Sequence, residues 1–391
     1  MKISLKRTPE QIELVKAMAS RNRDVAYEAQ VALAAFLGPV LAEVINNAPV
    51  LSNLFSPLSF NAEDNPSIPL DLYYDITDED YIQVYSQSVA GGLPTNQVLP
   101  TTSEMKITTY TLDSALSFDK RYAAKSRMDV VSKTFTRMAQ EILAKQERTS
   151  GTLILGALAK AVTNNKKHVQ RANAQGRFLL QDMNELLTLS RRVFTSFTGG
   201  TKPDGQSGMG VTDLLISPEI EEELRAMAYN PINTKGVLST TPDGSNAGIA
   251  APESVRVGLF NGSGISSFYG VNLMVFNEFG YGRKFNEIFK TLANGISYTK
   301  ADGSSSSGFG AAENSLTAYD ELILGINRNR ESLIRAIAVD SETGSEFSLI
   351  ADDQYSIRQN KIGYFGSLEE GRMVLDNRAL FGKIVNRSTA S

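Results

Sequence analysis

The side chains that could carry out chemistry are few and widely separated in this sequence. His168 is the only histidine and there is no cysteine, so one chain offers no thiolate nucleophile, no disulfide and no multi-histidine metal site. No nucleophile turn of the Gly-x-Ser-x-Gly kind is present. Carboxylates are numerous, so a hydrolase that uses only Asp and Glu stays open as the enzyme alternative. The sequence therefore predicts a protein with no catalytic residues, no cofactor and no bound metal.

Three other segments invite a chemical interpretation. The Gly-rich residues 198–210 lack the Gly-Lys-Ser/Thr of a phosphate loop, which argues against nucleotide binding. Residues 164–175 carry Lys166, Lys167 and Arg171 and could contact phosphate, but a solvated loop is favoured. Between residues 71 and 80, carboxylates two or three apart suit a hard cation, but the glycine and distal Glu of an EF-hand loop are absent. A solvated turn is favoured for these five acidic residues: Asp71, Asp75, Asp78, Glu79 and Asp80.

The composition is that of a globular protein. Hydrophobic residues make up 42% of the 391 residues and charged residues 21%. A net charge of −4 and a pI near 5.4 argue against a dedicated nucleic-acid binder, although a local basic patch stays open. No secretory signal is evident, and the most apolar stretch, Val31–Ile45, contains Gly38 and Pro39 and is too short to span a bilayer. We expect a soluble protein made in the cytoplasm.

The chain is organised around a long stretch from residue 81 to residue 164. Tyr81–Val89 and Glu104–Arg121 have the period-two pattern of strands and predict an extended hairpin with a turn-rich tip. The apolar parity of the second arm changes near Thr108-Thr109, which predicts a bulge or twist, since one inserted residue turns every later side chain to the other face. A ribbon this long has too little apolar surface to pack on its own chain. We therefore expect it to lie on a neighbour.

Helices are expected after the hairpin, near the N-terminus and in the middle of the chain. Four apolar residues from Val131 to Ile142 recur at the spacing of one helix face, and Gly151 is expected to bend or interrupt this helix. Thr8-Pro9 and Ser217-Pro218 are helix starts, with a hydroxyl N-cap and a proline in the first turn. Gly38-Pro39 is expected to break the N-terminal helix.

Extended segments occupy much of the rest. Asn46–Asp71 is predicted to be an extended arm that lies on another surface, because it has apolar spots without periodicity. Ser332–Val339 and Tyr355–Phe365 are predicted to form a second hairpin, joined by a polar connection at Ser341–Asp353. Further strands are expected at Val255–Phe260, Phe268–Phe276 and Asp320–Ile326, and a short helix at Phe285–Leu292.

The order of these elements resembles the major capsid protein of tailed bacteriophages, the HK97-like family. Three segments carry the resemblance: the hairpin that runs into a helix at Tyr81–Asn164, the strand and helix start at Asp213–Glu219, and the ending from Leu333–Ile337 through Lys361–Phe365 to Gly371–Asp376. The resemblance implies an α+β fold with an N-terminal arm, an extended β-hairpin loop, a long spine helix, and peripheral and axial domains.

The resemblance also implies a division of the chain and a function. The parts would be an arm with helices (1–71), the extended loop (72–121), the peripheral domain with its spine helix (122–229), the axial domain (230–325), and the return strands with the C-terminus (326–391). The protein would self-assemble as pentamers and hexamers into an icosahedral shell that encloses phage DNA without sequence-specific binding. It would be located in the virion capsid and assemble in the host cytoplasm, with separate scaffolding, portal and decoration proteins and no membrane.

Contacts between subunits would then replace an active site. At the hairpin tip, two glycines and a proline form a turn with Leu93 at its apex. Since the hairpin is expected to lie on a neighbouring subunit, Leu93 is expected to contact that subunit. The expected contact residues are Gly91, Gly92, Leu93 and Pro94 at the tip, Leu51, Leu54 and Phe55 in the arm, and Asp352 and Asp353 near the C-terminal hairpin. Two alternatives stay open: an encapsulin, which is a bacterial compartment shell, and the carboxylate-dependent hydrolase.

Overall fold

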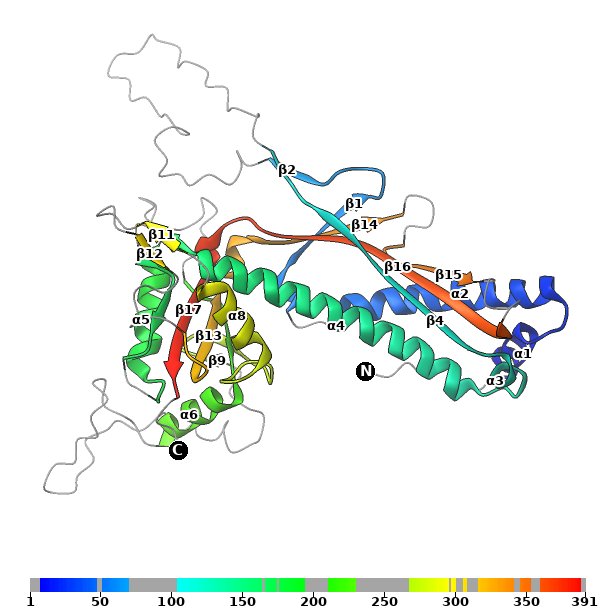
Figure 1. Ribbon diagram of the computed structural model, residues 1–391, viewed down its shortest axis with the longest axis horizontal. Helices are drawn as coiled ribbons and strands as arrows, with labels where there is room; N and C mark the ends of the chain where they lie inside the picture. The colour runs from blue at the N-terminus through cyan, green and yellow to red at the C-terminus, as the bar shows by residue number, and fades with distance from the viewer. Residues whose placement is uncertain are drawn as a thin grey trace, which may run out of the picture. The chain divides into compact units, whose positions relative to one another are not determined.

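The computed structural model combines helices and sheets, as the predicted α+β class requires, and divides into two compact units (Figure 1). Unit 1 comprises Met1–Leu70, Thr101–Ser150 and Leu333–Met373, and unit 2 comprises Asp71–Pro100, Gly151–Ser332 and Val374–Ser391. The structure describes residues 8–47, 51–69, 104–163, 166–173, 176–193, 210–229, 267–294, 297–299, 305–307, 316–340, 345–352 and 359–387.

Two helices open unit 1: α1 (Pro9–Met18) and α2 (Arg23–Asn47). Thr8 caps α1 as predicted, because its Oγ1 accepts a hydrogen bond from the Gln11 N–H at 3.4 Å. The predicted break at Gly38-Pro39 is wrong, since α2 runs through Pro39 without interruption. An interior proline costs about 3 kcal/mol. Leu33, Leu37, Leu41 and Ile45 are buried on both sides of it, so packing of one helix face outweighs that cost.

A five-stranded sheet lies against these helices in unit 1. Its strands are β1 (Ser56–Asn61), β4 (Thr109–Asp119), β14 (Leu333–Val339), β15 (Ser348–Asp352) and β16 (Lys361–Val374). β16 pairs antiparallel with β4 from Lys361–Asp119 to Gly371–Thr109, and with β15 from Asp352 to Ser348. β1 pairs parallel with β14 at the edge of the sheet. The hairpin was expected to lie on a neighbouring chain, and for β4 this expectation is wrong, because β4 pairs with β16 of its own chain.

The predicted change of parity in this arm is confirmed. β3 (Glu104–Lys106) pairs with β2 (Ser67–Pro69), and the chain leaves regular pairing at Ile107 and Thr108 before β4 begins. Ile107 is buried, whereas the buried residues of β4 are Leu112 and Phe118, so the inward side chains change from odd to even numbers. The other predicted arm, Tyr81–Val89, lies outside the described residues.

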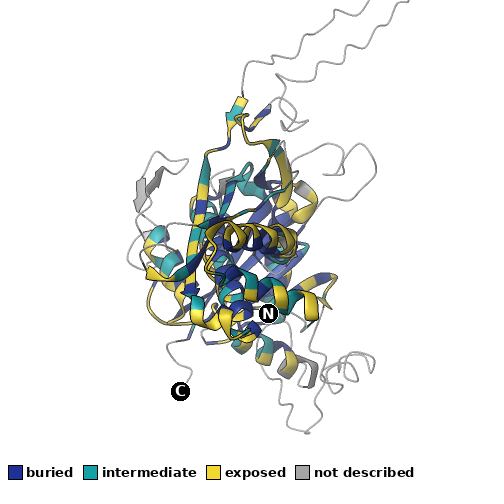
Figure 2. Ribbon diagram, turned by 90° about the vertical axis from the view of Figure 1, so that its right-hand side faces the viewer, coloured by how far each residue is buried: buried dark blue, intermediate teal, exposed yellow. Residues whose placement is uncertain are grey.

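The helix that follows is α4 (Met128–Lys160), reached through the short α3 (Lys120–Ala124). Its predicted stripe is confirmed, because Val131, Phe135, Met138 and Ile142 are at most 3% exposed. The expected bend or interruption at Gly151 is not seen, since the helix is continuous there and Gly151 allows close approach of the Phe285 ring. Helices and strands of unit 1 turn buried residues inward and exposed residues outward (Figure 2).

Unit 2 is built on a six-stranded sheet with the order β7-β17-β13-β8-β10-β9. Its helices are α5 (Leu180–Arg192), α6 (Pro218–Tyr229) and α8 (Lys284–Asn294). The strands of the sheet are β7 (Val169–Arg171), β8 (Asp213–Ile216), β9 (Ser267–Phe268), β10 (Val271–Val275), β13 (Asp320–Ile326) and β17 (Leu380–Asn386). The predicted start of α6 is confirmed, because Ser217 Oγ accepts the Ile220 N–H at 3.2 Å.

Small elements complete unit 2. They are the pairs β5 (Val162–Thr163) with β6 (Lys166–Lys167) and β11 (Ser297–Thr299) with β12 (Ser305–Ser307). The solvated loop predicted at 164–175 is therefore wrong where the structure describes it: two short strands form there, and Val169 is buried.

Three further predictions need correction. The polar connection predicted at Ser341–Asp353 contains β15, so the C-terminal hairpin consists of β15 and β16. The single strand predicted at Phe268–Phe276 is the hairpin β9–β10, because Tyr269 and Gly270 both have positive φ and reverse the chain. Asn46–Asp71 is not an extended arm throughout, since it contains the end of α2, a 3-10 turn at Ser52–Leu54, and strands β1 and β2. The strand predicted at Val255–Phe260 lies outside the described residues.

Candidate assembly surface

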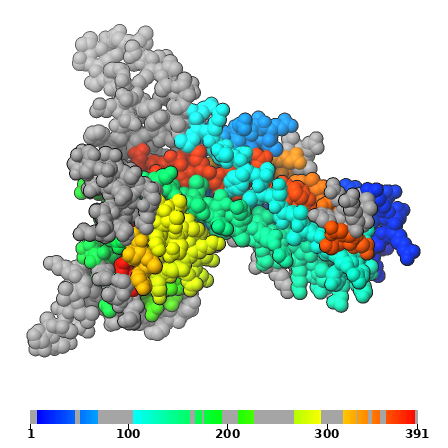
Figure 3. Space-filling view, in the orientation of Figure 1, coloured from blue at the N-terminus to red at the C-terminus, as the bar shows by residue number. Residues whose placement is uncertain are grey.

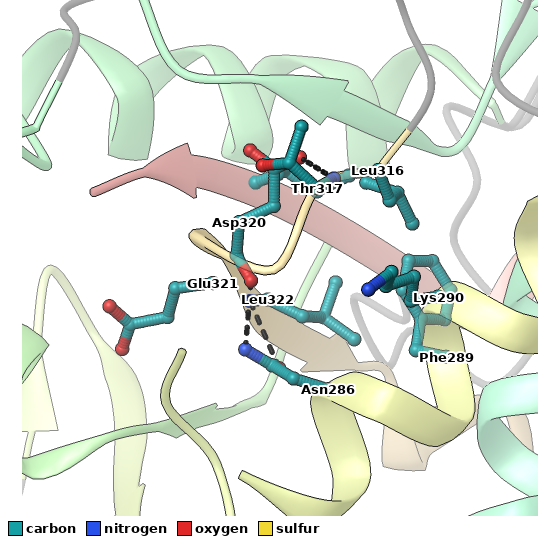
Figure 4. A pocket seen from close by; sticks show the side chains of 9 residues that line it. Asn286, Phe289, Lys290, Leu316, Thr317, Asp320, Glu321 and Leu322 are labelled. Carbon is teal, nitrogen blue, oxygen red and sulfur yellow. Dashed lines mark hydrogen bonds between the residues drawn. The ribbon is translucent and has the colours of Figure 1, made fainter. Parts of the chain in front are cut away.

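The pocket that described residues form in unit 2 is too small for a substrate molecule. The pocket in Figure 4 lies beside β13 and α8 in unit 2 and has a volume of about 10 Å³, which is about one water molecule. Its polar groups are used by the fold: the Asn286 side chain donates to the Asp320 carbonyl at 3.0 Å and accepts the Leu322 N–H at 3.2 Å, and Asp320 Oδ2 accepts the Thr317 N–H at 2.7 Å.

The only histidine serves a structural purpose. His168 is fully buried in unit 2, where its ring stacks on Phe381 with 5.3 Å between centroids. Its Nδ1 lies 3.1 Å from the Asn377 carbonyl and 3.0 Å from the Leu380 carbonyl. Burial lowers the pKa of His168 and outweighs the opposing effect of the two carbonyls. Within the described ranges, His, Asp and Glu side chains form no group that could hold a metal ion.

The most developed polar structure of unit 1 is an ionic cluster around Glu370 on β16. The Glu370 carboxylate accepts hydrogen bonds from Arg335 Nε on β14 (3.0 Å) and from Arg372 Nη2 (3.0 Å) and Nε (3.2 Å). It also accepts from Tyr110 on β4 (2.8 Å) and from Gln146 on α4 (3.1 Å). Burial alone would raise the pKa of Glu370, but the guanidinium groups, Arg372 foremost, hold it below its ordinary value. The cluster ties three strands to α4.

The same cluster fixes the segment that follows α2. Arg372 Nη1 donates to Ser52 Oγ at 2.7 Å and also to Ser150 Oγ on α4, and its guanidinium lies 5.6 Å from the centroid of the Phe55 ring. The Glu147 carboxylate accepts the N–H groups of Leu51 (3.1 Å) and Ser52 (3.3 Å). The direction in which β1 leaves α2 is therefore set by contacts inside unit 1.

The structure places the expected contact residues in different environments. Leu51, Leu54 and Phe55 are 1%, 5% and 4% exposed within unit 1, so their side chains are already covered by their own subunit. Asp352 is half-buried at the end of β15. The tip residues Gly91, Gly92, Leu93 and Pro94, as well as Asp353, lie outside the described residues.

Sequence reasoning missed the apolar outer face of α2. Val25, Val31, Phe36 and Val40 are 43%, 44%, 54% and 39% exposed, although the opposite face of the helix is buried. No charged residue occurs between Glu28 and Glu43, a signal that the sequence did contain. Among the described helices, α2 alone is long and apolar enough to cross a membrane by length and composition. The expectation that this region is too short is wrong, because the helix continues through Pro39. Its inner face nevertheless belongs to the core of unit 1.

No protein-family model and no curated protein matches the chain. Solved structures that resemble it include phage capsids and an encapsulin. They include the SrpI encapsulin of Synechococcus elongatus (13% identity, 87% of this chain and 88% of that chain, TM-score 0.43) and the capsid of cyanophage P-SCSP1u (12%, 87% and 89%, 0.43). The capsid of an empty GTA particle is also similar (11%, 86% and 89%, 0.46).

Proposed function

We propose that this chain is an HK97-like major capsid protein that assembles as pentamers and hexamers into an icosahedral shell enclosing phage DNA. The observation that carries the proposal is the outer face of α2, which is apolar between Glu28 and Glu43 and exposed in the single subunit. Contiguous exposed apolar surface on a folded protein marks a place where another molecule binds. A shell subunit buries such faces against its copies.

The exposed edges of the sheet in unit 1 also support binding to another chain. Residues of β1 are exposed apart from the half-buried Phe60, and within the described residues β1 pairs only with β14. β4 likewise pairs only with β16 within the part of the chain that the structure describes. Exposed strand edges offer unpaired N–H and carbonyl groups to another chain. Tyr81–Val89, the arm predicted to pair with β4, and the tip at Gly91–Pro94 would supply such contacts in the assembled shell.

We propose a virion location after assembly in the host cytoplasm, with separate scaffolding, portal and decoration proteins. The division of the chain that the resemblance implies, from the arm (1–71) to the return strands (326–391), is part of the same proposal.

Particle formation tests the proposal. The purified chain, expressed alone and with the scaffolding and portal proteins of its own genome, should form closed particles visible by negative-stain electron microscopy. Phe36→Asp on the outer face of α2 should abolish particles while the far-UV circular dichroism stays unchanged, and Tyr319→Asp, at a 54% exposed site in unit 2, is the control. A folded chain that forms no particle under any of these conditions contradicts the proposal.

A further inference from the structure

One lysine of unit 2 is buried among apolar side chains. Lys383, in the middle of β17, is fully buried, and it is the only buried lysine among the residues that the structure describes. Phe381 and Val385 share its face of the strand, since side chains two positions apart point the same way, and both belong to one core with Met183 and Leu186 of α5. On the face of unit 2 shown in Figure 3, little of β17 is visible beside β13. The Lys383 amine therefore lies where water does not solvate it.

Two carboxylates of α5 meet this amine. Lys383 Nζ lies 2.7 Å from Glu185 Oε2 and 3.4 Å from Asp182 Oδ1. Asp182 is fully buried, whereas the Glu185 side chain is 37% exposed. Burying an ammonium and a carboxylate together is costly, because each loses its hydration. An amide between Lys383 and Asp182 removes both of these buried charges and leaves only the partly solvated Glu185 ionised.

The Asp182 carboxylate is held as the acceptor of an acyl transfer would be. Its Oδ1 accepts the Asn173 N–H at 2.9 Å and the Asn173 Nδ2 at 3.1 Å, and its Oδ2 accepts the Leu179 N–H at 2.9 Å. When an amine attacks Cγ, negative charge develops on Oδ1, and the two Asn173 donors are placed to stabilise it. Since Nζ is 3.4 Å from Oδ1, it is also within reach of the carbon bonded to that oxygen.

Glu185 is placed to take the protons that the amine must lose. An ammonium has no free electron pair, so Lys383 can attack only after deprotonation, and its Nζ already donates to Glu185 Oε2. Burial raises the pKa of Glu185, but hydrogen bonds from Lys383, Asn173 and Gln181 outweigh it and keep the pKa below its ordinary value. The Glu185 carboxylate is therefore ionised and able to accept a proton. Its exposed side also gives the leaving water a route to solvent.

We propose that Lys383 and Asp182 form an isopeptide bond, which joins β17 to α5 within one subunit. The bond between Lys383 Nζ and Asp182 Cγ forms, and the bond between Cγ and Oδ2 breaks. Glu185 carries two of the three Nζ protons in turn to Oδ2, which leaves as water, and the third proton stays on the amide nitrogen. Glu185 ends as the carboxylate that it was at the start, so no further reactant is needed. The inference concerns a single subunit and does not depend on the shell proposal.

An exposed ion pair of the same chain provides an internal comparison. Lys290 Nζ on α8 lies 3.5 Å from Glu287 Oε2, a spacing similar to that between Lys383 and Asp182. The two side chains are 32% and 49% exposed, so water stabilises both ions. We therefore expect no amide at this pair. Burial and the Asn173 donors, rather than distance alone, distinguish the proposed site.

The intact mass of the wild-type chain tests the proposal without any variant. Formation of the bond removes one water molecule, so the chain of 42.6 kDa should be about 18 Da lighter than its sequence requires. Trypsin does not cleave after an acylated lysine, so tandem mass spectrometry of the digest should find a branched peptide joining residues 178–191 to residues 379–387. Lys290 should occur in unbranched peptides only. A wild-type chain with its full sequence mass and no branched peptide overturns the inference.

Three variants test the assigned chemistry, and far-UV circular dichroism checks that each one folds. Glu185→Gln keeps the size of the side chain but cannot take up the protons, so the linked fraction should fall about tenfold or more. Lys383→Arg should have its full sequence mass. Glu222→Gln, at an exposed carboxylate of α6, is the matched control and should remain linked. Full linkage in Glu185→Gln overturns the proton transfer, and a loss of water that persists in Lys383→Arg overturns the bond itself.

Discussion

Glu370→Gln is the substitution that tests the ionic cluster of unit 1 most directly. The change keeps the size of the side chain but removes the charge that faces Arg335 and Arg372, whose side chains are only 6% and 1% exposed. Removing one partner of a buried ion pair costs about 3–5 kcal/mol. We expect the free energy of unfolding of unit 1 to fall by about that amount, because two buried guanidinium groups then lose their shared carboxylate.

Urea unfolding followed by far-UV circular dichroism measures this change, since the chain has no tryptophan to report by fluorescence. Glu369→Gln is the matched control: it neutralises the neighbouring, half-buried carboxylate of β16 and should change the free energy of unfolding by less than about 0.5 kcal/mol. If Glu370→Gln lies within about 1 kcal/mol of the wild type, the carboxylate does not compensate the two arginines and the reasoning is wrong.

Gly151→Ala should lower the calorimetric melting temperature, because the added Cβ meets the Phe285 ring (2.9 Å from Cζ) and outweighs a gain in helix propensity of about 1 kcal/mol. Gly156→Ala, whose nearest neighbour is 3.8 Å away, should raise it, and equal shifts would contradict this. His168, the only histidine, should titrate by NMR below its ordinary pKa of 6.5. The contribution of neutral His168 to the free energy of unfolding should be complete above pH 6.5 and decrease as the pH falls below it, because the unfolded chain binds the proton more readily. An NMR titration midpoint of His168 at or above 6.5 would refute this. Leu93→Asp should reduce particle formation in light scattering without changing circular dichroism, and unchanged yield would show that the tip makes no contact.

Elements whose signal is local could be predicted from the sequence. The stripe from Val131 to Ile142 predicts α4 because an apolar residue at every third or fourth position fits a single helix face. The parity change near Thr108 was also visible in the sequence. Side chains alternate between the two faces of a strand, so one irregular residue moves every later apolar side chain from odd to even positions. Hydroxyl caps at Thr8 and Ser217 marked two helix starts.

β17 was not predicted because distant residues decide it. Lys383 in the middle of the strand is fully buried, yet its Nζ lies 2.7 Å from Glu185 Oε2 and 3.4 Å from Asp182 Oδ1, both on α5. A lysine within an apolar run suggests a solvent-facing position, and only the fold supplies the carboxylates that permit burial. Gly382 is likewise untypical of a strand interior, and only the close approach of Val169 in the folded chain explains it.

The candidate assembly surface was only partly predictable. The uncharged stretch between Glu28 and Glu43 is visible in the sequence, but its sequence does not say which half of α2 faces the core. Leu51 and Phe55 were expected at an interface because they are apolar spots in an aperiodic segment, and that pattern does not distinguish a neighbour's surface from the subunit's own. Only the folded structure shows which surface covers such residues.

The discontinuity of unit 1 has a consequence for synthesis on the ribosome. β1 and β4 are translated early, but their partners β14 and β16 belong to the third stretch of the unit, which starts at Leu333. At about 5–20 residues per second, the roughly 180 residues between Ser150 and Leu333 take about 10–40 s to translate. During that interval the inner faces of α2 and α4 have no complete sheet to pack on. We therefore expect the nascent chain to depend on chaperones until its last strands emerge.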